Sequence, residues 1–182
     1  MENIRERKLK RYFTAIDADG SGTLTRGDFE LVARRYVDAL NLAPDSHQAE
    51  KTRTATLKIW DDLISPMDAN GDGKVSPEEF IDALQKSLAT DRAAYAESIR
   101  PSANAYFELC DADDNGEVDE QEYIRLMGAA CGIPADEAAA TYRTLVPPAH
   151  DGMTRESWHE MLLSFFYDEE PDSPANHIFG RL

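Results

Sequence analysis

Apolar residues recur at helical spacing on both sides of a polar stretch near the start of the chain. The apolar positions are Ile4, Leu9, Tyr12, Phe13 and Ile16 before the stretch, and Phe29, Val32, Ala33 and Tyr36 after it. Steps of three and four residues place such side chains on one face of an α-helix. The pattern therefore predicts a helix, a polar loop and a second helix.

This helix–loop–helix pattern occurs three times. The polar loops are loop 1 (residues 17–28, DADGSGTLTRGD), loop 2 (68–79, DANGDGKVSPEE) and loop 3 (111–122, DADDNGEVDEQE). Each has oxygen-bearing side chains at positions one, three and five, a glycine at six, an apolar residue at eight and an acid at twelve. The flanks repeat too, since Phe29, Phe80 and Tyr123 follow the three loops directly. A repeat at this level predicts three copies of one structural unit.

Helix-start signals lie near the end of each loop. In loop 2, Ser76 precedes Pro77 and stands three residues before Glu79, as in a capping box with proline at the first helical position. Asp119 and Glu122 give the corresponding signal in loop 3, and Thr25 with Asp28 gives a weaker one in loop 1. We therefore expect a helix to begin inside each loop.

A fourth unit is recognisable only from its flanks. Its apolar and aromatic framework positions are Tyr142, Leu145, Met153 and Trp158. Its ligand positions are Val146, Pro148, His150 and Ser157, which cannot hold a hard cation. A register with Gly152 as the turn glycine places Pro147 first and Trp158 last, and is no better. We expect this unit to brace the third.

The apolar residue at position eight predicts how the loops pair. Two such loops side by side form a short antiparallel contact through these residues. We expect Leu24 to pair with Val75, and Val118 to pair with Met153.

The loops concentrate carboxylates that repel one another, so a cation is expected among them. Calcium takes six to eight oxygen ligands, and glycine at position six allows the sharp turn that wraps the ion. The predicted ligands, with the backbone carbonyl at position seven, are Asp17, Asp19, Ser21, Thr23 and Asp28 in loop 1, Asp68, Asn70, Asp72, Lys74 and Glu79 in loop 2, and Asp111, Asp113, Asn115, Glu117 and Glu122 in loop 3. Ser76 can reach the second ion through a water molecule.

The three predicted sites differ in strength. Loop 3 has four acids around the ion, including Asp119, so we expect it to bind calcium most tightly. Loop 1 ends in Asp28, which is one methylene shorter than glutamate and can supply a single oxygen. A six-ligand shell suits magnesium, so the first site is expected to be the weakest or to tolerate magnesium.

Spacing between the loops indicates further helices. Asp17 and Asp68 are 51 residues apart, which leaves room for a long helix before loop 2. The gap before loop 3 allows an additional helical turn or two, ending near Pro101. We predict an N-terminal pair at 1–90, a C-terminal pair at 91–170, and a tail at 171–182 that packs back through Ile178 and Phe179.

Composition narrows the class of partner. The 182 residues carry a formal net charge of −16, which disfavours nucleic acid and anionic membranes and favours cations. The N-terminal stretch lacks the apolar core of a signal peptide, and no run approaches about twenty apolar residues. We expect a soluble, cytoplasmic monomer in which Cys110 and Cys131 are buried free thiols. Three bound calcium ions would move the formal charge from −16 to −10, so we expect binding to drive folding.

On these loops and flanks the chain resembles the EF-hand superfamily, and within it the sarcoplasmic calcium-binding protein and calerythrin group. The tail PDSPANHIFG is also similar to that group's. The resemblance implies an all-α protein with two EF-hand pairs packed into one compact globule. It also implies high-affinity buffering of calcium, or of calcium and magnesium, in the cytosol. The silent fourth unit and Asp28 in place of the more common glutamate depart from the usual pattern.

Other functions remain open at this point. A calcium sensor exposes a methionine-rich groove to a protein partner, but Met67, Met127, Met153 and Met161 are scattered here. A small-ligand binder like the photoproteins would need an interior lined by residues such as Trp60, Trp158, His159 and Tyr167. Aromatic residues at helical spacing are usually core. The histidines His47, His150 and His177 are expected at the surface or as caps. We find no phosphate loop, zinc spacing or Ser-His-Asp pattern, so we do not expect an enzyme.

Overall fold

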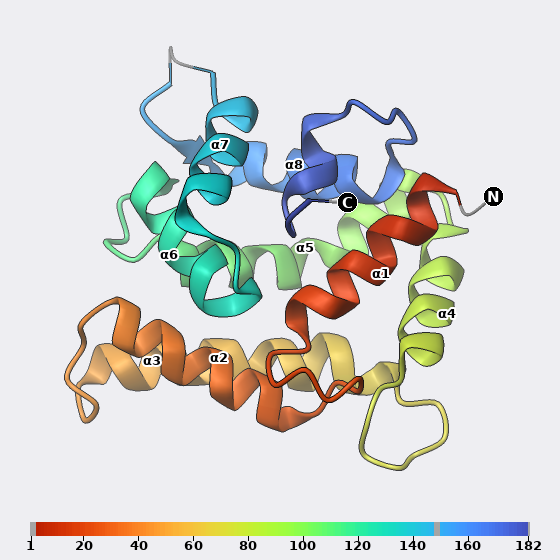
Figure 1. The fold of residues 1–182 in the computed structure, drawn as a ribbon, viewed down its shortest axis with the longest axis horizontal. Helices are drawn as coiled ribbons and strands as arrows, with labels where there is room; N and C mark the ends of the chain where they lie inside the picture. The colour runs from red at the N-terminus through yellow and green to blue at the C-terminus, as the bar shows by residue number, and fades with distance from the viewer. Residues whose placement is uncertain (1–2, 148–149, 182) are drawn as a thin grey trace.

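The computed structural model describes residues 3–147 and 150–181, and these residues are mainly helical (Figure 1). The helices are α1 (Ile4–Ile16), α2 (Arg26–Ala39), α3 (His47–Ile59), α4 (Pro77–Leu88), α5 (Arg92–Cys110), α6 (Glu120–Cys131), α7 (Ala135–Leu145) and α8 (Arg155–Tyr167). Two short strands, β1 (Glu117–Val118) and β2 (Met153–Thr154), form an antiparallel pair. The predicted all-α class is confirmed.

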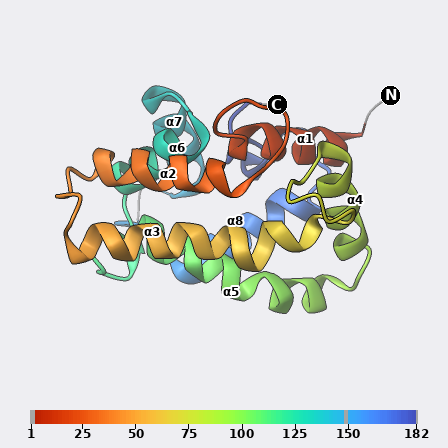
Figure 2. The ribbon, with the colours of Figure 1, turned by 90° about the horizontal axis from the view of Figure 1, so that it is seen from below.

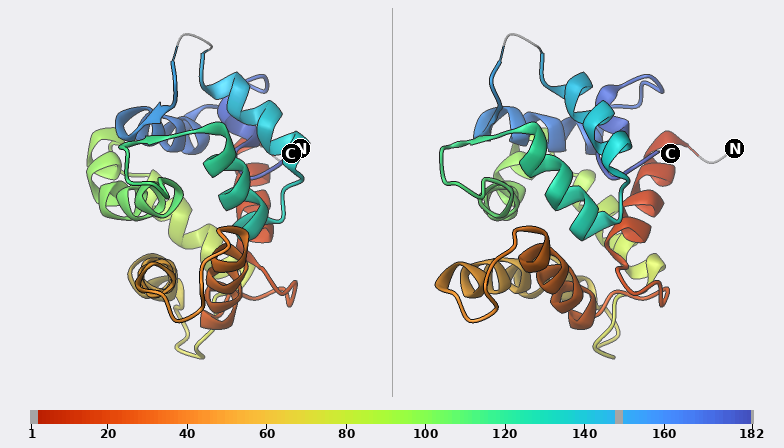
Figure 3. Two further views of the ribbon diagram at one scale, coloured as in Figure 1. Left: turned by 90° about the vertical axis from the view of Figure 1, so that its left-hand side faces the viewer. Right: turned by 60° about the vertical axis from the view of Figure 1, so that its left-hand side comes forward.

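The helices form two layers. Helices α2 and α3 lie side by side, and Figure 2 shows them running across the molecule one beside the other. Helix α2 packs on α6, and α3 packs on α5, which joins this layer to the C-terminal helices (Figure 3). The division into pairs at 1–90 and 91–170 stays a prediction, because these packed helices cross the proposed boundary.

The long helix predicted before loop 2 is confirmed, with a change of winding. Helix α3 continues into a π-helical turn at Trp60–Ile64 and a 3₁₀ turn at Ser65–Met67. The ring of Trp60 lies 5.6 Å from that of Phe29, measured between centroids. The winding change lets the chain bury Trp60 and Ile64 while it turns into loop 2.

The prediction that a helix ends near Pro101 is wrong. Helix α5 runs from Arg92 through Pro101 to Cys110 without a break. Proline removes one backbone N–H and disfavours a helical conformation before it. Here Tyr95 lies before the proline, Phe107 lies after it, and both are buried. Burial on both sides of an exposed proline outweighs its local preference.

The predicted contacts between loops are confirmed. Leu24 and Val75 exchange two backbone N–H···O hydrogen bonds, both 2.9 Å long. Val118 is paired with Met153 in the β1–β2 ladder. All four side chains are buried, so each pairing also places apolar side chains in the core.

The C-terminal tail packs on the body as predicted. After a 3₁₀ turn at Pro174–His177, Ile178 and Phe179 are 2% and 8% exposed. The ring of Phe179 stacks on Tyr12 of α1 at 4.2 Å between centroids and meets Phe165 of α8 edge-on at 4.9 Å. Figure 1 shows this segment beside α1. The tail therefore joins the first helix to the last.

Both cysteines are free thiols, as predicted, although Cys131 is only partly buried and Cys110 fully so. Burial raises the pKa of both thiols, that of Cys131 to about 12. In the part of the chain that the structure describes, no helix is long and apolar enough to cross a lipid bilayer.

Candidate metal centres

Loop 1 folds around the carboxylate of its first residue. Asp17 accepts backbone hydrogen bonds from Ser21 (3.0 Å) and Gly22 (2.9 Å). The buried Asp28 carboxylate accepts from the backbone N–H of Asp19 (3.1 Å) and that of Thr25 (2.8 Å). One carboxylate oxygen each from Asp17, Asp19 and Asp28 lie within 4.8 Å of one another. Three of the five predicted ligands of this loop therefore converge on one point.

Loop 3 has the same construction. Asp111 accepts from the backbone N–H groups of Asn115 and Gly116, both at 3.0 Å. Glu122, the last predicted ligand, accepts from the backbone N–H of Ala112 at 2.8 Å and is 2% exposed. Oxygens of Asp111, Asp113 and Glu122 again lie within 4.8 Å of one another. The loop holds these acids together across a span of twelve residues.

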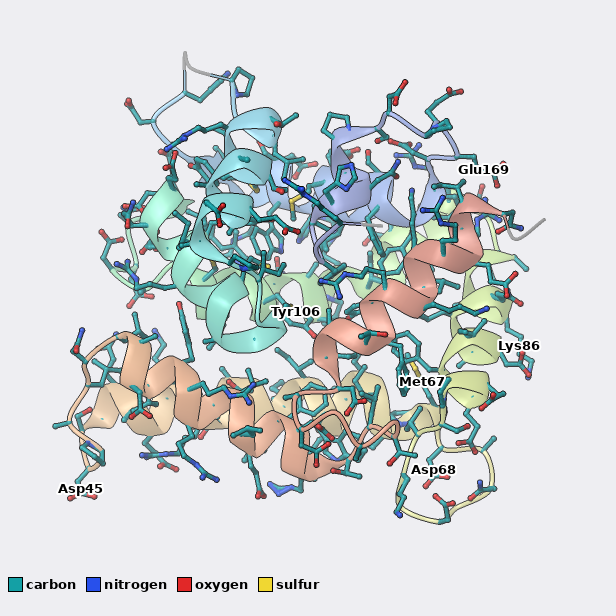
Figure 4. The ribbon with its side chains drawn as sticks, viewed as in Figure 1. Asp45, Met67, Asp68, Lys86, Tyr106 and Glu169 are labelled. Carbon is teal, nitrogen blue, oxygen red and sulfur yellow. The ribbon has the colours of Figure 1, made fainter. Side chains whose placement is uncertain are left out.

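Loop 2 has the same backbone construction, but Asn70 stands where loops 1 and 3 have an acid at position three, so the loop has no cluster of three acids like theirs among the described residues. Asp68 accepts from the backbone N–H groups of Gly71 (2.7 Å) and Gly73 (2.9 Å). The N–H of Asp72 donates to Asn70 (2.8 Å), and the Asp72 carboxylate accepts from the backbone N–H of Lys74 (2.9 Å), as Asn115 accepts from that of Glu117 in loop 3. The side chains of loop 2 therefore follow the pattern of loop 3. Figure 4 shows Asp68 at the start of this loop, below α4.

Helix caps hold the last ligand of each loop. Glu79 accepts from the backbone N–H and the hydroxyl of Ser76, both at 3.0 Å, in the predicted capping box. Glu122 accepts from the N–H of Asp119 (3.0 Å), and Thr25 donates to Asp28 through its hydroxyl (3.0 Å). The same carboxylate thus caps a helix and reaches back over its loop.

Hydrogen bonds also lower the pKa of two of these acids. Bonds from Ser21 are the largest cause of a lowered pKa at Asp19. Bonds from Ser76 are the largest cause of a lowered pKa at Glu79. Both shifts favour the anionic form, which is the form that a cation binds.

The remaining predicted ligands lie in the loops, with some already hydrogen-bonded. The Ser21 hydroxyl donates to the carbonyl oxygen of Thr23 (3.0 Å), which brings both predicted ligands together. The amide of Asn115 donates to Asp113 (3.1 Å), and its carbonyl oxygen accepts from the N–H of Glu117 (2.8 Å). Lys74 is exposed.

Position four of each loop is a feature that the sequence reasoning missed. The predicted glycines at position six have positive φ, and so do the residues at position four: Gly20, Gly71 and Asp114. Asp114 has φ 57° and pairs with Lys51 of α3 at 3.1 Å. Glycine or aspartate tolerates this conformation better than most residues. The sequence signal for this conformation is that only glycine and aspartate occur at position four of the three loops.

The fourth unit has no comparable cluster among its described residues. Val146 is buried, while His150 and Ser157 are exposed, and Pro148 lies outside the described residues. The unit instead supports loop 3, because the hydroxyl of Tyr142 donates to the carbonyl oxygen of Val118 at 2.8 Å. A Cβ atom on Gly152 would lie 2.9 Å from that of Glu117, so the backbones approach closely here.

The donor sets of loops 1 and 3 fit a hard divalent cation. Oxygen ligands from carboxylates, carbonyls and hydroxyls are those that calcium and magnesium prefer. Carboxylates held this close repel one another unless a positive charge lies between them. The geometry therefore fits a calcium-type or magnesium-type ion.

Comparison with known proteins agrees with this geometry. Residues 6–85 match the family model described as an EF-hand domain pair. Over these residues the chain is similar to EF-hand proteins. Calerythrin from Saccharopolyspora erythraea is 24% identical to it over 140 residues, which are 76% of this chain and 78% of calerythrin. The sarcoplasmic calcium-binding protein β chain from a Penaeus species is 26% identical over 186 residues, covering 98% of this chain and 95% of that protein.

Solved structures show the same fold. The coelenterazine-binding protein from Renilla muelleri, in its calcium-loaded apo form, matches this chain with a TM-score of 0.82 at 22% identity. The match covers 100% of this chain and 99% of that one. The predicted resemblance to the EF-hand superfamily and to the sarcoplasmic calcium-binding protein and calerythrin group is confirmed.

Proposed function

We propose that this protein binds calcium ions at loops 1, 2 and 3 and buffers calcium, or calcium and magnesium, in the cytoplasm. The carrying observation is the convergence of Asp111, Asp113 and Glu122 in loop 3, with two of the three carboxylates buried. Buried acids so close together need a cation to offset their repulsion. When bound, the ion supplies the positive charge that stabilises the folded loops.

Loop 2 belongs to the same proposal. It has oxygen-bearing side chains at positions one, three and five and an acid at position twelve, as the other loops do, and its pairing through Val75 joins it to loop 1. The Asp72 carboxylate accepts from the N–H of Lys74 through one oxygen, which leaves its other oxygen for the ion. We therefore infer three sites, of which the third is tightest and the first tolerates magnesium.

The positions of the methionines and of the tail support a calcium buffer over a calcium sensor. Met127, Met153 and Met161 are at most 6% exposed, so they belong to the core. A sensor needs such side chains in a groove that a target can reach. The tail also joins α1 to α8 through Phe179, which resists opening. Binding of a dye to apolar surface, compared with and without calcium, separates the two functions: a large rise with calcium favours the sensor.

A photoprotein-like role has less support. Of the four residues predicted to line an interior, Trp158 borders the central cavity, whereas Trp60, His159 and Tyr167 do not. His159 instead lies 3.0 Å from Asn104 and 3.4 Å from Arg100, measured from its ring nitrogens to their side chains. That cavity therefore has no histidine to take part in chemistry, and we propose no enzymatic activity.

Calorimetric titration with calcium, with and without millimolar magnesium, tests the proposal. We expect three calcium ions to bind. Millimolar magnesium is expected to reduce the heat of calcium binding at one site. Neutralising loop 3 alone, with Glu122→Gln, is expected to remove one site and leave two. No heat of binding in the intact protein would overturn the proposal, and an unchanged count in Glu122→Gln would overturn the assignment of loop 3.

A further inference from the structure

Loop 3 differs from the other two loops at position four. Gly20 and Gly71 occupy this position in loops 1 and 2, whereas Asp114 occupies it in loop 3. All three residues have positive φ, which is 57° at Asp114. A residue with a Cβ is less stable than glycine in this conformation, and it persists where its surroundings hold it. The contacts of the Asp114 side chain therefore help to hold the shape of loop 3.

These contacts come from helix α3, which belongs to the second unit. The ammonium group of Lys51 lies 3.1 Å from Asp114 Oδ1 and 3.2 Å from Asp114 Oδ2. Three residues earlier on α3, the side-chain amide of Gln48 donates to the carbonyl oxygen of Ala112 at 3.3 Å. Figure 1 shows the start of α3 and the loop between α5 and α6 on the same side of the molecule. Two side chains of α3 thus hold loop 3 at its positions two and four.

The peptide unit between Ala112 and Asp113 connects α3 to a predicted calcium ligand. Its carbonyl oxygen accepts from Gln48, and its N–H, which is that of Asp113, donates to Glu122 Oε1 at 3.4 Å. The N–H of Ala112 donates to the same oxygen at 2.8 Å. Because a peptide unit is planar, fixing its carbonyl oxygen also fixes the direction of its N–H. Gln48 therefore helps to orient the carboxylate at the last position of loop 3.

The packing beside this contact is open. A groove of about 400 Å³ lies between α3 and the end of α5, and its lining includes Gln48, Lys51, Glu108 and Ala112. Among the described residues, the side-chain hydrogen bonds and the ion pair between α3 and loop 3 come from Gln48 and Lys51. The contact therefore depends on two long polar side chains, which a substitution can remove without opening a cavity in the core.

Helix α3 also leads into loop 2. From Ile59 the chain continues through the π-helical turn at Trp60–Ile64 and the 3₁₀ turn at Ser65–Met67, and loop 2 begins at Asp68. An ion at loop 2 restricts the motion of Asp68 and of the helix that ends beside it. A second site that depends on an element already ordered in this way loses less conformational entropy when it binds its own ion.

We propose that Gln48 and Lys51 are positioning residues of the third calcium site, and that they couple its affinity to the occupancy of loop 2. Calcium at loop 2 orders α3, and α3 then holds Asp114 and the peptide unit before Asp113 in the shape that binds an ion. By linkage, calcium at loop 3 raises the affinity of loop 2 by the same factor. This coupling rests on the proposed function, because it joins two of the proposed calcium sites.

Calcium titration of nitrogen-15-labelled protein measures the two sites separately. The backbone N–H groups of Gly116 in loop 3 and Gly73 in loop 2 each donate to the first carboxylate of their own loop, at 3.0 and 2.9 Å. Their resonances therefore report the state of each loop. The quantity to compare is the calcium concentration that half-saturates the change at Gly116.

Two variants remove the contacts from α3. Gln48→Leu removes one hydrogen bond without a change of charge, and we expect it to raise the half-saturating concentration at loop 3 about 2- to 10-fold. Lys51→Met is expected to raise it about 2- to 5-fold. Loss of a positive charge would by itself favour calcium, so this rise is opposite to the effect of charge alone.

Matched controls exist on the same surface. Lys58 also lies on α3, but it pairs with Asp62 and not with loop 3. Gln85 is exposed on α4. Lys58→Met and Gln85→Leu should therefore leave the half-saturating concentration at loop 3 unchanged.

Disabling loop 2 measures the coupling itself. Glu79→Gln removes the closing carboxylate of loop 2, and we expect it to raise the half-saturating concentration at loop 3 about 2- to 10-fold. When Gln48→Leu and Lys51→Met are already present, Glu79→Gln should have a smaller effect, because the link is lost. A role of these side chains in folding alone would give equal effects in both backgrounds.

Two results would overturn the proposal. The first is an unchanged half-saturating concentration at loop 3 in Gln48→Leu. The second is an equal effect of Glu79→Gln with and without the contacts from α3. If the combined variant does not fold, Gln48→Leu alone still decides the first. A wild-type Gly116 resonance that ignores calcium would overturn the calcium site at loop 3 itself, whereas a normal response that Gln48→Leu leaves unchanged would overturn the coupling alone.

Discussion

The ammonium group of Lys8 lies 2.8 Å from the backbone carbonyl oxygen of Phe165, 157 residues away in the sequence. The same group donates to the carbonyl oxygen of Asp168 at 2.6 Å, so a side chain of α1 satisfies the C-terminal end of α8. Lys8 is 1% exposed, and burial lowers its pKa. A lysine in this position is a structural element of the contact between the first and last helices.

Replacing Lys8 by methionine keeps the aliphatic packing and removes both donors. The buried carbonyl oxygen of Phe165 and the partly buried one of Asp168 then lose a partner, so we expect a loss of about 1–3 kcal/mol in the free energy of unfolding. That corresponds to a fall of about 4–8 °C in melting temperature for the middle of this range. Lys10→Met is the matched control, since Lys10 makes an exposed pair with Glu6, and should change stability by less than about 0.5 kcal/mol. Equal effects of the two variants would contradict the assigned role.

Gly152→Ala tests the close approach between the fourth unit and loop 3. The added Cβ would meet Glu117 Cβ at 2.9 Å and the carbonyl oxygen of Val118 at 3.2 Å. We expect a loss of about 1–3 kcal/mol and weaker calcium binding at the third site, because β1 must move. Gly128→Ala is the control, since its Cβ would have no neighbour closer than 3.7 Å inside α6, and should stabilise by about 0.5–1 kcal/mol. Urea unfolding and calcium titration of both variants measure these effects.

Asp28→Glu tests the predicted weakness of the first site. The longer side chain can offer both carboxylate oxygens to the ion, so we expect tighter calcium binding and a larger ratio of calcium to magnesium affinity. Asp28→Asn removes the charge at the same position and should weaken the site. Calorimetric titration with calcium and with magnesium measures the change in affinity for each ion. Calcium affinity that is unchanged in Asp28→Glu would refute the prediction.

Alkaline pH should destabilise the protein through thiol groups whose pKa is raised by burial in the folded state. Burial raises the pKa of Cys131 to about 12, whereas a thiol in an unfolded chain ionises near pH 8.5. Between these values the folded state binds one more proton than the unfolded state, so the free energy of unfolding falls as pH rises. The slope is about 1.4 kcal/mol per pH unit for one such group. Urea unfolding at pH 8, 9 and 10 should show this fall, and Cys131→Ser should make it shallower by about that amount.

Removing the ions should loosen the fold. Three calcium ions would change the formal charge from −16 to −10, which relieves repulsion in the folded state. We expect chelator to produce a partly molten protein and calcium to raise the melting temperature strongly. Magnesium in place of calcium is the control for charge alone and should restore part of the rise. A melting temperature that does not respond to chelator would contradict the coupling of binding to folding.

Local patterns explain why so much was predictable. The repeat of oxygen-bearing residues, glycine and a closing acid specifies a loop whose geometry depends on neighbouring residues, so Asp17 and Asp28 were recognisable without a structure. Capping by Ser76 and the pairing of Leu24 with Val75 follow from the same register. The N–H group from which each side chain accepts was not predictable, because several such groups lie close together: Asp68 accepts from Gly71, whereas Asp111 accepts from Asn115.

By itself the sequence determined the helix–loop–helix units, the acids that converge in loops 1 and 3, and the loss of ligands in the fourth unit, because each is set within about a dozen residues. The tertiary structure decided the passage of α5 through Pro101, the burial of Lys8 against α8 and the cavity beside Trp158. These features join residues from distant parts of the chain, and their energies come from burial and from hydrogen bonds whose partners no local pattern names.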